Sequence, residues 1–164
     1  MPSWALTLAY TLHMAATVAW IGGLFFQSVF LGPALRRTLD PPSALRLLEL
    51  LRRRFDPLAW LSLAVLIATG LTQMTASPSY EGFLALQNPW AVAILAKHGL
   101  IALMVALAGY QTLFLYPWLS RLALRPQGAP EELALAERRQ VRLSRWSVLL
   151  SLAVLGLTAL ARTA

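Results

Sequence analysis

Two histidines are the side chains in this sequence best suited to hold a metal. His13 lies in the apolar run Leu12–Phe26, and His98 follows Lys97 in a second long apolar run. The chain contains no other histidine and no cysteine, which excludes disulfides, iron–sulfur clusters and thiolate metal sites. Any metal or cofactor would therefore be bound through nitrogen, oxygen or thioether ligands.

The composition indicates that both histidines belong to a membrane protein. Of the 164 residues, 58% are hydrophobic and 13% are charged, and the mean hydropathy is +0.61. Roughly 20 apolar residues make one spanning helix, so the chain has room for four. We predict an all-α integral membrane protein, an up-down four-helix transmembrane bundle forming a single domain over residues 1–164. The spans are expected at about residues 4–31, 57–76, 90–119 and 146–161.

The segments between the spans contain helix-start signals. Asp40 and the prolines that follow it begin the stretch ALRLLELLRRRF, whose leucines alternate with arginines. This pattern predicts a short amphipathic helix in the membrane interface, between helices 1 and 2. Pro130, followed by Glu131 and Glu132, is a second start signal, and we expect that helix to continue into the fourth span.

The basic residues predict the topology. Six of the fourteen lie between spans one and two, and six more lie between spans three and four. The two groups are Arg36, Arg37, Arg46, Arg52, Arg53 and Arg54, and Arg121, Arg125, Arg138, Arg139, Arg142 and Arg145. By the positive-inside rule both connections are cytoplasmic and both termini lie outside, as in a multi-pass protein of a bacterial inner membrane. We therefore read the net charge of +7 as a topology signal and expect the lipid bilayer, not nucleic acid, as its partner.

This topology predicts that the two histidines lie at one depth. His13 is nine residues into the first span, or ~13 Å, and His98 is eight residues into the third, or ~12 Å. The neighbours at helical spacing include small residues and aromatics, which leave room for a flat ring. They include Tyr10, Ala16, Trp20 and Ala102. We infer a b-type haem held between helices 1 and 3 in the outer half of the membrane, with His13 and His98 as axial ligands of the iron.

Other interpretations of these polar residues stay open. Either histidine could simply bond to a hydroxyl or carbonyl of a neighbouring helix, and Met74 or Met104 could replace one of them as a haem ligand. Lys97 points about 100° away from His98 and either snorkels to the outer surface or pairs with a haem propionate, as Arg162 could also do. Gln27 and Gln111 lie toward the cytoplasmic ends of their helices, where a quinone is one conceivable redox partner.

A family resemblance adds to this interpretation. The stretches HMAATVAWIGGLFFQSVFLGPAL, RRFDPLAWLSLAVLIATGLTQ and LAKHGLIALMVALAG resemble, in that order, the copper-resistance D (CopD) domain of bacterial membrane proteins. The first stretch, with a lysine in a later helix, is also similar to HemJ-type protoporphyrinogen oxidases, and this resemblance implies that His13 and Lys97 match the histidine and lysine of that family's haem site. The CopD resemblance implies copper movement.

The sequence thus predicts a haem b protein that performs electron transfer or a small redox reaction as a haem-dependent oxidoreductase. The alternatives are a CopD-like protein that handles a copper ion, a HemJ-like protoporphyrinogen oxidase and a cofactor-free bundle. The redox partner and the oligomeric state are not encoded in a form that can be read.

Overall fold

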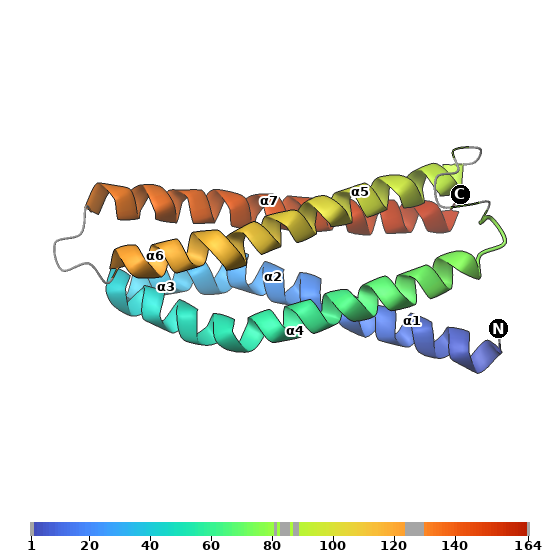
Figure 1. Ribbon diagram of the computed structural model, residues 1–164, viewed down its shortest axis with the longest axis horizontal. Helices are drawn as coiled ribbons and strands as arrows, with labels where there is room; N and C mark the ends of the chain where they lie inside the picture. The colour runs from blue at the N-terminus through green and yellow to red at the C-terminus, as the bar shows by residue number, and fades with distance from the viewer. Residues whose placement is uncertain (1, 81, 83–85, 87–88, 124–129, 164) are drawn as a thin grey trace.

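Four long helical rods lie side by side in the computed structural model of the chain (Figure 1). The structure describes residues 2–80, 82, 86, 89–123 and 130–163, and within these ranges it leaves out the side chains of residues 41, 42, 123, 130, 162 and 163. No strand occurs in those ranges. The elements are α1 (Ser3–Thr17), η1 (Val18–Gly22), α2 (Gly23–Phe25), η2 (Phe26–Leu31), α3 (Gly32–Thr38), α4 (Pro41–Thr75), α5 (Pro89–Tyr110), η3 (Gln111–Leu115), α6 (Tyr116–Ala123) and α7 (Pro130–Thr163).

The four predicted spans are confirmed, and each helix is longer than predicted. Helices at residues 3–38, 43–75, 89–122 and 131–161 are long and apolar enough to cross a membrane. The first and third rods stay continuous because η2 and η3, two short π-helical segments, lie just before prolines. Pro33 and Pro117 each clash with the carbonyl four residues earlier, and those carbonyls, of Val29 and Leu113, lie inside the π-helical segments. The wider π-helical turn lets the backbone pass each proline without ending the helix.

The amphipathic stretch after Asp40 is helical, but it does not form a separate interfacial helix. It is the first half of α4, which runs from Pro41 to Thr75 without a break and contains Pro57. The helix starts where predicted, because the Asp40 carboxylate accepts a hydrogen bond from the Ser43 backbone N–H at 3.1 Å. Hydrogen bonds from Ser43 also hold the pKa of Asp40 below its ordinary value. Ion pairs from Arg52 to Glu49 and to Asp56 lie along α4 in the two turns before Pro57.

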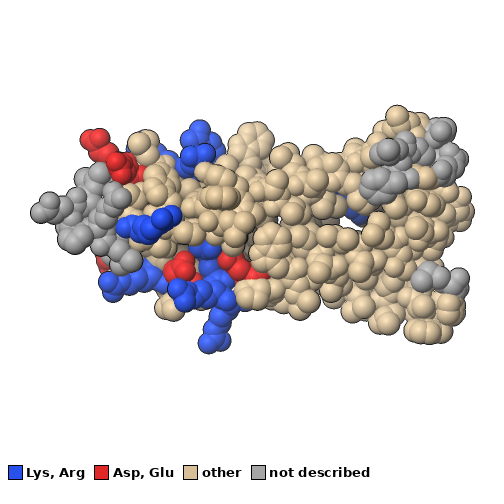
Figure 2. All heavy atoms as spheres, in the orientation of Figure 1, with Lys and Arg blue, Asp and Glu red and all other residues tan. Residues whose placement is uncertain are grey.

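The rods follow one another around the bundle in chain order. The most extensive contacts are between α1 and α4 and between α5 and α7, while α2 and η2 contact α7 and α4 contacts α6. The first and third spans are therefore diagonal, as in an up-down bundle. Both termini lie at one end (Figure 1). Lys, Arg, Asp and Glu side chains gather at the opposite end, and the remaining surface in that view is almost free of charge (Figure 2).

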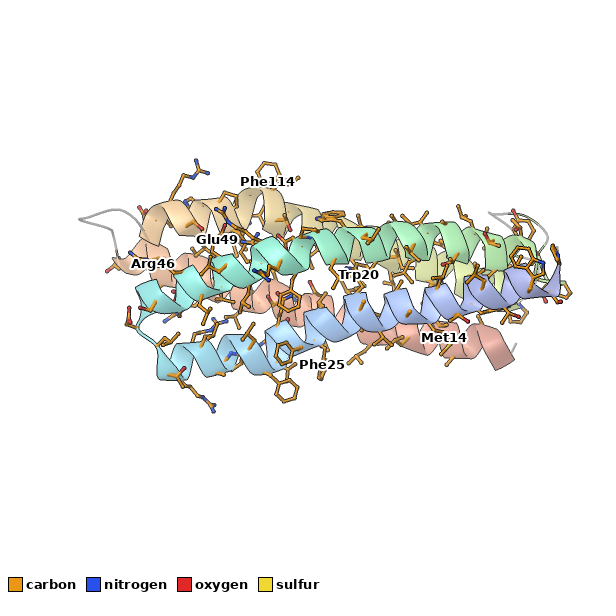
Figure 3. The ribbon with its side chains drawn as sticks, turned by 90° about the horizontal axis from the view of Figure 1, so that it is seen from below. Met14, Trp20, Phe25, Arg46, Glu49 and Phe114 are labelled. Atoms are coloured by element: carbon orange, nitrogen blue, oxygen red, sulfur yellow. The ribbon has the colours of Figure 1, made fainter. Side chains whose placement is uncertain are left out.

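One apolar layer crosses the middle of the bundle. It consists of Trp20, Leu63, Met104 and Val154, one residue from each span, and all four are buried. Figure 3 shows Trp20 lying between the helices, whereas Met14, Phe25 and Phe114 point outward. In a membrane protein such outward residues face lipid, so the exposed leucines and phenylalanines along the rods are expected.

We expect Met104→Ala to lower the free energy of unfolding by about 2–4 kcal/mol, because it opens a cavity in this layer. Its neighbour Leu103 is 53% exposed, so Leu103→Ala is a matched control and should change that free energy by less than about 1 kcal/mol. Unfolding in mixed micelles with increasing SDS measures both. Equal losses in the two variants would contradict the assignment of Met104 to a packed layer.

Candidate functional site

His13 is bonded to the second span, which lies beside the first. Its Nδ1 lies 2.8 Å from Oγ1 of Thr69, and that hydroxyl donates its own hydrogen to the Val65 carbonyl at 2.6 Å. The threonine oxygen must therefore accept from the ring, so Nδ1 carries the hydrogen and Nε2 carries the lone pair. This is the arrangement that metal-ligating histidines adopt, because a bond to one ring nitrogen fixes the tautomer and the orientation of the other.

Neighbouring residues of α4 make room for this ring and fix α1 beside it. A Cβ at Gly70 would come within 3.3 Å of the His13 Cε1, so the glycine lets the imidazole approach the helix closely. One turn further along α4, Gln73 Nε2 donates to the Ala9 carbonyl at 3.2 Å. Thr69, Gly70 and Gln73 thus hold the first span against the second, toward the end of the bundle with the termini.

His98 has the same tautomer for a different reason. Its Nδ1 lies 2.7 Å from the Ile94 carbonyl, one turn earlier in α5. A carbonyl only accepts, so here too Nδ1 carries the hydrogen and Nε2 the lone pair. Both imidazoles therefore present a basic Nε2, and both are half-buried.

Lys97 precedes His98 on α5 and faces His13 closely enough to influence its ring. It is half-buried on α5, and its ammonium acts on the His13 ring across the bundle. The diagonal helices α1 and α5 therefore bring charge and imidazole within mutual reach at this level. Pairing of His13 with His98 on one haem iron stays a prediction: the bond from His13 Nδ1 runs to α4, and the bond from His98 Nδ1 stays within α5.

The other predicted site residues are divided between the interior and the surface. Ala16 and Trp20 are buried, and Trp20 belongs to the apolar layer. Tyr10 and Ala102 are exposed, so they face away from the bundle interior. The side chain of Arg162 lies outside the described residues. Over the described ranges no group of three His, Cys, Asp or Glu residues is close enough to hold a metal, so further ligands would have to be of another kind, and Met74 and Met104 are buried thioethers.

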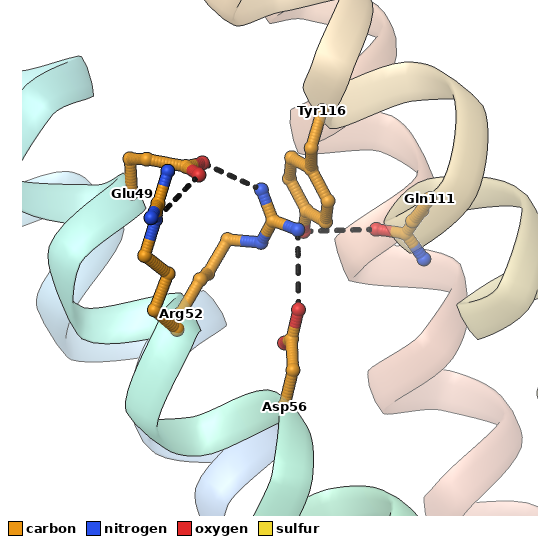
Figure 4. A network of polar contacts seen from close by, with 6 residues as sticks. Glu49, Arg52, Asp56, Gln111 and Tyr116 are labelled. Atoms are coloured by element: carbon orange, nitrogen blue, oxygen red, sulfur yellow. Dashed lines mark hydrogen bonds and ion pairs between the residues drawn. The ribbon is translucent and has the colours of Figure 1, made fainter.

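A second polar cluster lies at the charged end and was missed by the sequence analysis. Arg52 pairs with Glu49 and with Asp56, each at 3.2 Å, and its guanidinium lies 3.4 Å from the centre of the Tyr116 ring (Figure 4). The Tyr116 hydroxyl donates to Gln111 Oε1 at 3.4 Å. The spacing of Glu49, Arg52 and Asp56 by three and four residues was the available signal, because such residues share one helix face.

A cavity of about 140 Å³ lies beside this cluster, inside the bundle. All four spans line it, with polar groups that include Gln27, Asp56, Gln111 and Ser144. Neither histidine lines it. The interior therefore contains two separate polar regions, one around His13 toward the end with the termini and one at the charged end.

Comparison with known proteins identifies a family. The model of the family described as copper resistance protein D (CopD) matches residues 49–161, which covers spans two to four and includes Thr69, Lys97 and His98. His13 precedes the matched range. No curated protein and no solved structure gives a significant match.

The Thr69 hydroxyl determines the tautomer of His13, so we expect Thr69→Val to mix the two neutral tautomers and Thr69→Ser to preserve the native one. With only two histidines in the chain, ¹⁵N-histidine labelling and NMR resolve both rings, and a His98→Gln variant assigns them. A native His13 that carries its hydrogen on Nε2 would contradict this geometry.

Proposed function

The chain belongs to the copper resistance protein D family, and from this premise we propose that it handles copper ions, which its two imidazoles bind in transit through the bundle. The observation that carries the proposal is the bond from His13 Nδ1 to Thr69. This bond leaves the lone pair on Nε2 and fixes the orientation of the ring. His98 supplies a second such nitrogen, through its bond to the Ile94 carbonyl. Copper is the cargo in this proposal, not a resident cofactor.

The surroundings favour the cuprous ion. Imidazole nitrogens and thioether sulfurs are ligands that Cu(I) accepts, and Met104 and Met74 are buried in the same bundle. The positive charge of Lys97 repels any cation near His13, and this repulsion is half as strong for Cu(I) as for Cu(II). This repulsion lowers the affinity of the site for copper, so the bound ion can be released during transport.

The orientation that we propose follows the arginines. The end that carries them faces the cytoplasm of a bacterium, the termini lie outside the inner membrane, and the imidazoles lie in the outer half. Copper would then reach His13 and His98 from the outer side first.

A second candidate function is haem ligation for electron transfer. Its support is that the same two Nε2 atoms have the second-shell bonds that haem-ligating histidines use. A bound haem would supply one-electron chemistry, and Lys97 would be the cation available to a propionate. This candidate lacks the support that family membership gives to copper.

For the copper proposal we expect one Cu(I) per chain in purified protein, measured by competition with a chromophoric Cu(I) chelator. His13→Ala and His98→Ala should each weaken binding by at least about tenfold, and Thr69→Val, which loses the orienting bond, by about tenfold. Thr158→Val is the matched control, because the Thr158 hydroxyl donates within its own helix, to the Val154 carbonyl, and lies on the fourth span.

Unchanged affinity in both histidine variants would contradict the copper site. The same sample, prepared from haem-replete cells, tests the second candidate by a reduced-minus-oxidised absorption spectrum. A Soret and α-band pair that disappears in either histidine variant would favour haem, and absence of the pair would exclude it.

A further inference from the structure

The polar cavity at the charged end has the apolar layer as its inner boundary. Trp20 and Leu63 belong to the layer and also line the cavity. Arg52 and Asp56 line it toward the charged end, and Asp56 is 31% exposed, so this side approaches solvent. The cavity therefore lies between the charged surface and the middle of the bundle.

Two of the polar groups around this cavity, the Gln111 amide nitrogen and Arg52 Nε, are incompletely bonded. Gln111 Nε2 reaches Ser147 Oγ and the Leu107 carbonyl only at 3.4 Å, which is beyond the usual hydrogen-bond length, whereas the Tyr116 hydroxyl is bonded to Gln140 and Ser144. Within the described part of the chain, Arg52 Nε is buried and has no hydrogen-bond partner. Buried polar atoms of this kind normally bind ordered water.

The volume is suitable for water. A water molecule occupies about 30 Å³ of the liquid, so a cavity of about 140 Å³ holds roughly four or five. The cavity is too small for a drug-sized ligand, which needs roughly 300 Å³ or more. Its polar lining comes from every span, so each water molecule would find several protein partners.

We infer that this cavity is a water-filled vestibule open to the arginine-bearing side, and that the layer of Trp20, Leu63, Met104 and Val154 is the seal at its inner end. The vestibule brings solvent about halfway through the bundle, so a small hydrated cation entering from that side meets its main barrier at the seal. The inference concerns hydration and access, and it holds whether or not the imidazoles bind copper.

The cysteine-free chain permits a direct test by single-cysteine labelling. Ser144 and Ser147 line the cavity, whereas Ser151, one turn further along the same helix, is buried and does not. Each is replaced by cysteine in turn, and a membrane-impermeant methanethiosulfonate reagent is applied to vesicles with the arginine-bearing side outward. A thiol reacts as its thiolate, which forms readily only where water reaches it.

We expect Ser144→Cys and Ser147→Cys to react at least about tenfold faster than Ser151→Cys, as measured by the mass shift of the chain. Labelling of Ser144→Cys and Ser147→Cys only from the opposite side would overturn the proposed opening. Equal rates in all three variants, or no reaction in any, would overturn the vestibule itself. Because no copper is present, failure here is distinguishable from failure of the copper proposal.

A separate observation concerns the surface of the bundle between the first and fourth spans. A groove of about 610 Å³ is lined by Arg36 from the first span and by Arg138, Arg142 and Arg145 from α7. Glu137 is the one acidic residue in the lining, and among the described residues none of these four arginines has a carboxylate within salt-bridge distance. In the described part of the chain, four guanidinium groups without a carboxylate partner thus face one open groove.

The groove continues onto an apolar surface. Trp146 and Leu149 line it beyond the arginines and are both more than half exposed. Arginines at the charged end followed by apolar side chains toward the middle match the headgroup and acyl chains of a lipid. We propose that the groove binds the phosphate of an anionic phospholipid.

Native mass spectrometry of delipidated protein, reconstituted with phosphatidylglycerol or with phosphatidylcholine, tests this proposal. Phosphatidylglycerol should be retained, and the double variant Arg138→Gln, Arg142→Gln should weaken its binding by about thirtyfold, the effect of two basic charges at a membrane surface. The control Arg53→Gln, Arg54→Gln removes two exposed arginines outside the groove and should leave retention unchanged.

An excess of inorganic phosphate tests whether the groove recognises phosphate alone. Phosphate should fail to displace the lipid, because the acyl chains also contribute. Displacement by phosphate would overturn a lipid site in favour of a simple anion site. Equal retention of the two lipids, or an equal loss in both double variants, would overturn the proposal altogether.

Discussion

The absence of water from the bilayer core is the constraint on which the whole structure depends. Backbone N–H and C=O groups must bond within each segment, so every described span is helical, and π-helical turns preserve the helix before Pro33 and Pro117. The same constraint acts on side chains. Polar groups of the spanning helices turn inward and bond to other helices, as His13 does with Thr69 and Gln73 does with the Ala9 carbonyl.

These inward polar groups form two regions with an apolar layer between them. The region toward the termini contains the imidazole of His13, its threonine partner and the charge of Lys97. The region at the charged end contains Arg52, its carboxylates and the polar cavity. The proposed copper-handling role and the proposed vestibule both fit this division, because an ion that crosses the bundle would need a ligand set, an aqueous compartment and a barrier that separates them.

Local signals in the sequence predicted most of the fold. Hydrophobic runs gave the four spans, and Asp40 and Pro130 marked two helix starts that the structure has at the same places. The local sequence did not predict that α4 is continuous, because the arginines followed by Pro57 are typical of the end of one helix and the start of the next. The roles of Thr69 and of Arg52 depend on how neighbouring helices rotate toward one another. Sequence alone does not give that rotation, so the histidines were found and their partners were not.

The central claim is that His13 and His98 bind one copper ion, and X-ray absorption at the copper edge tests it most directly. For protein loaded with one Cu(I) per chain, the account predicts outer-shell scattering from two imidazole rings, reduced to one ring in either single histidine variant. A spectrum without imidazole scattering, or one that is unchanged when His13 and His98 are both replaced, would contradict it.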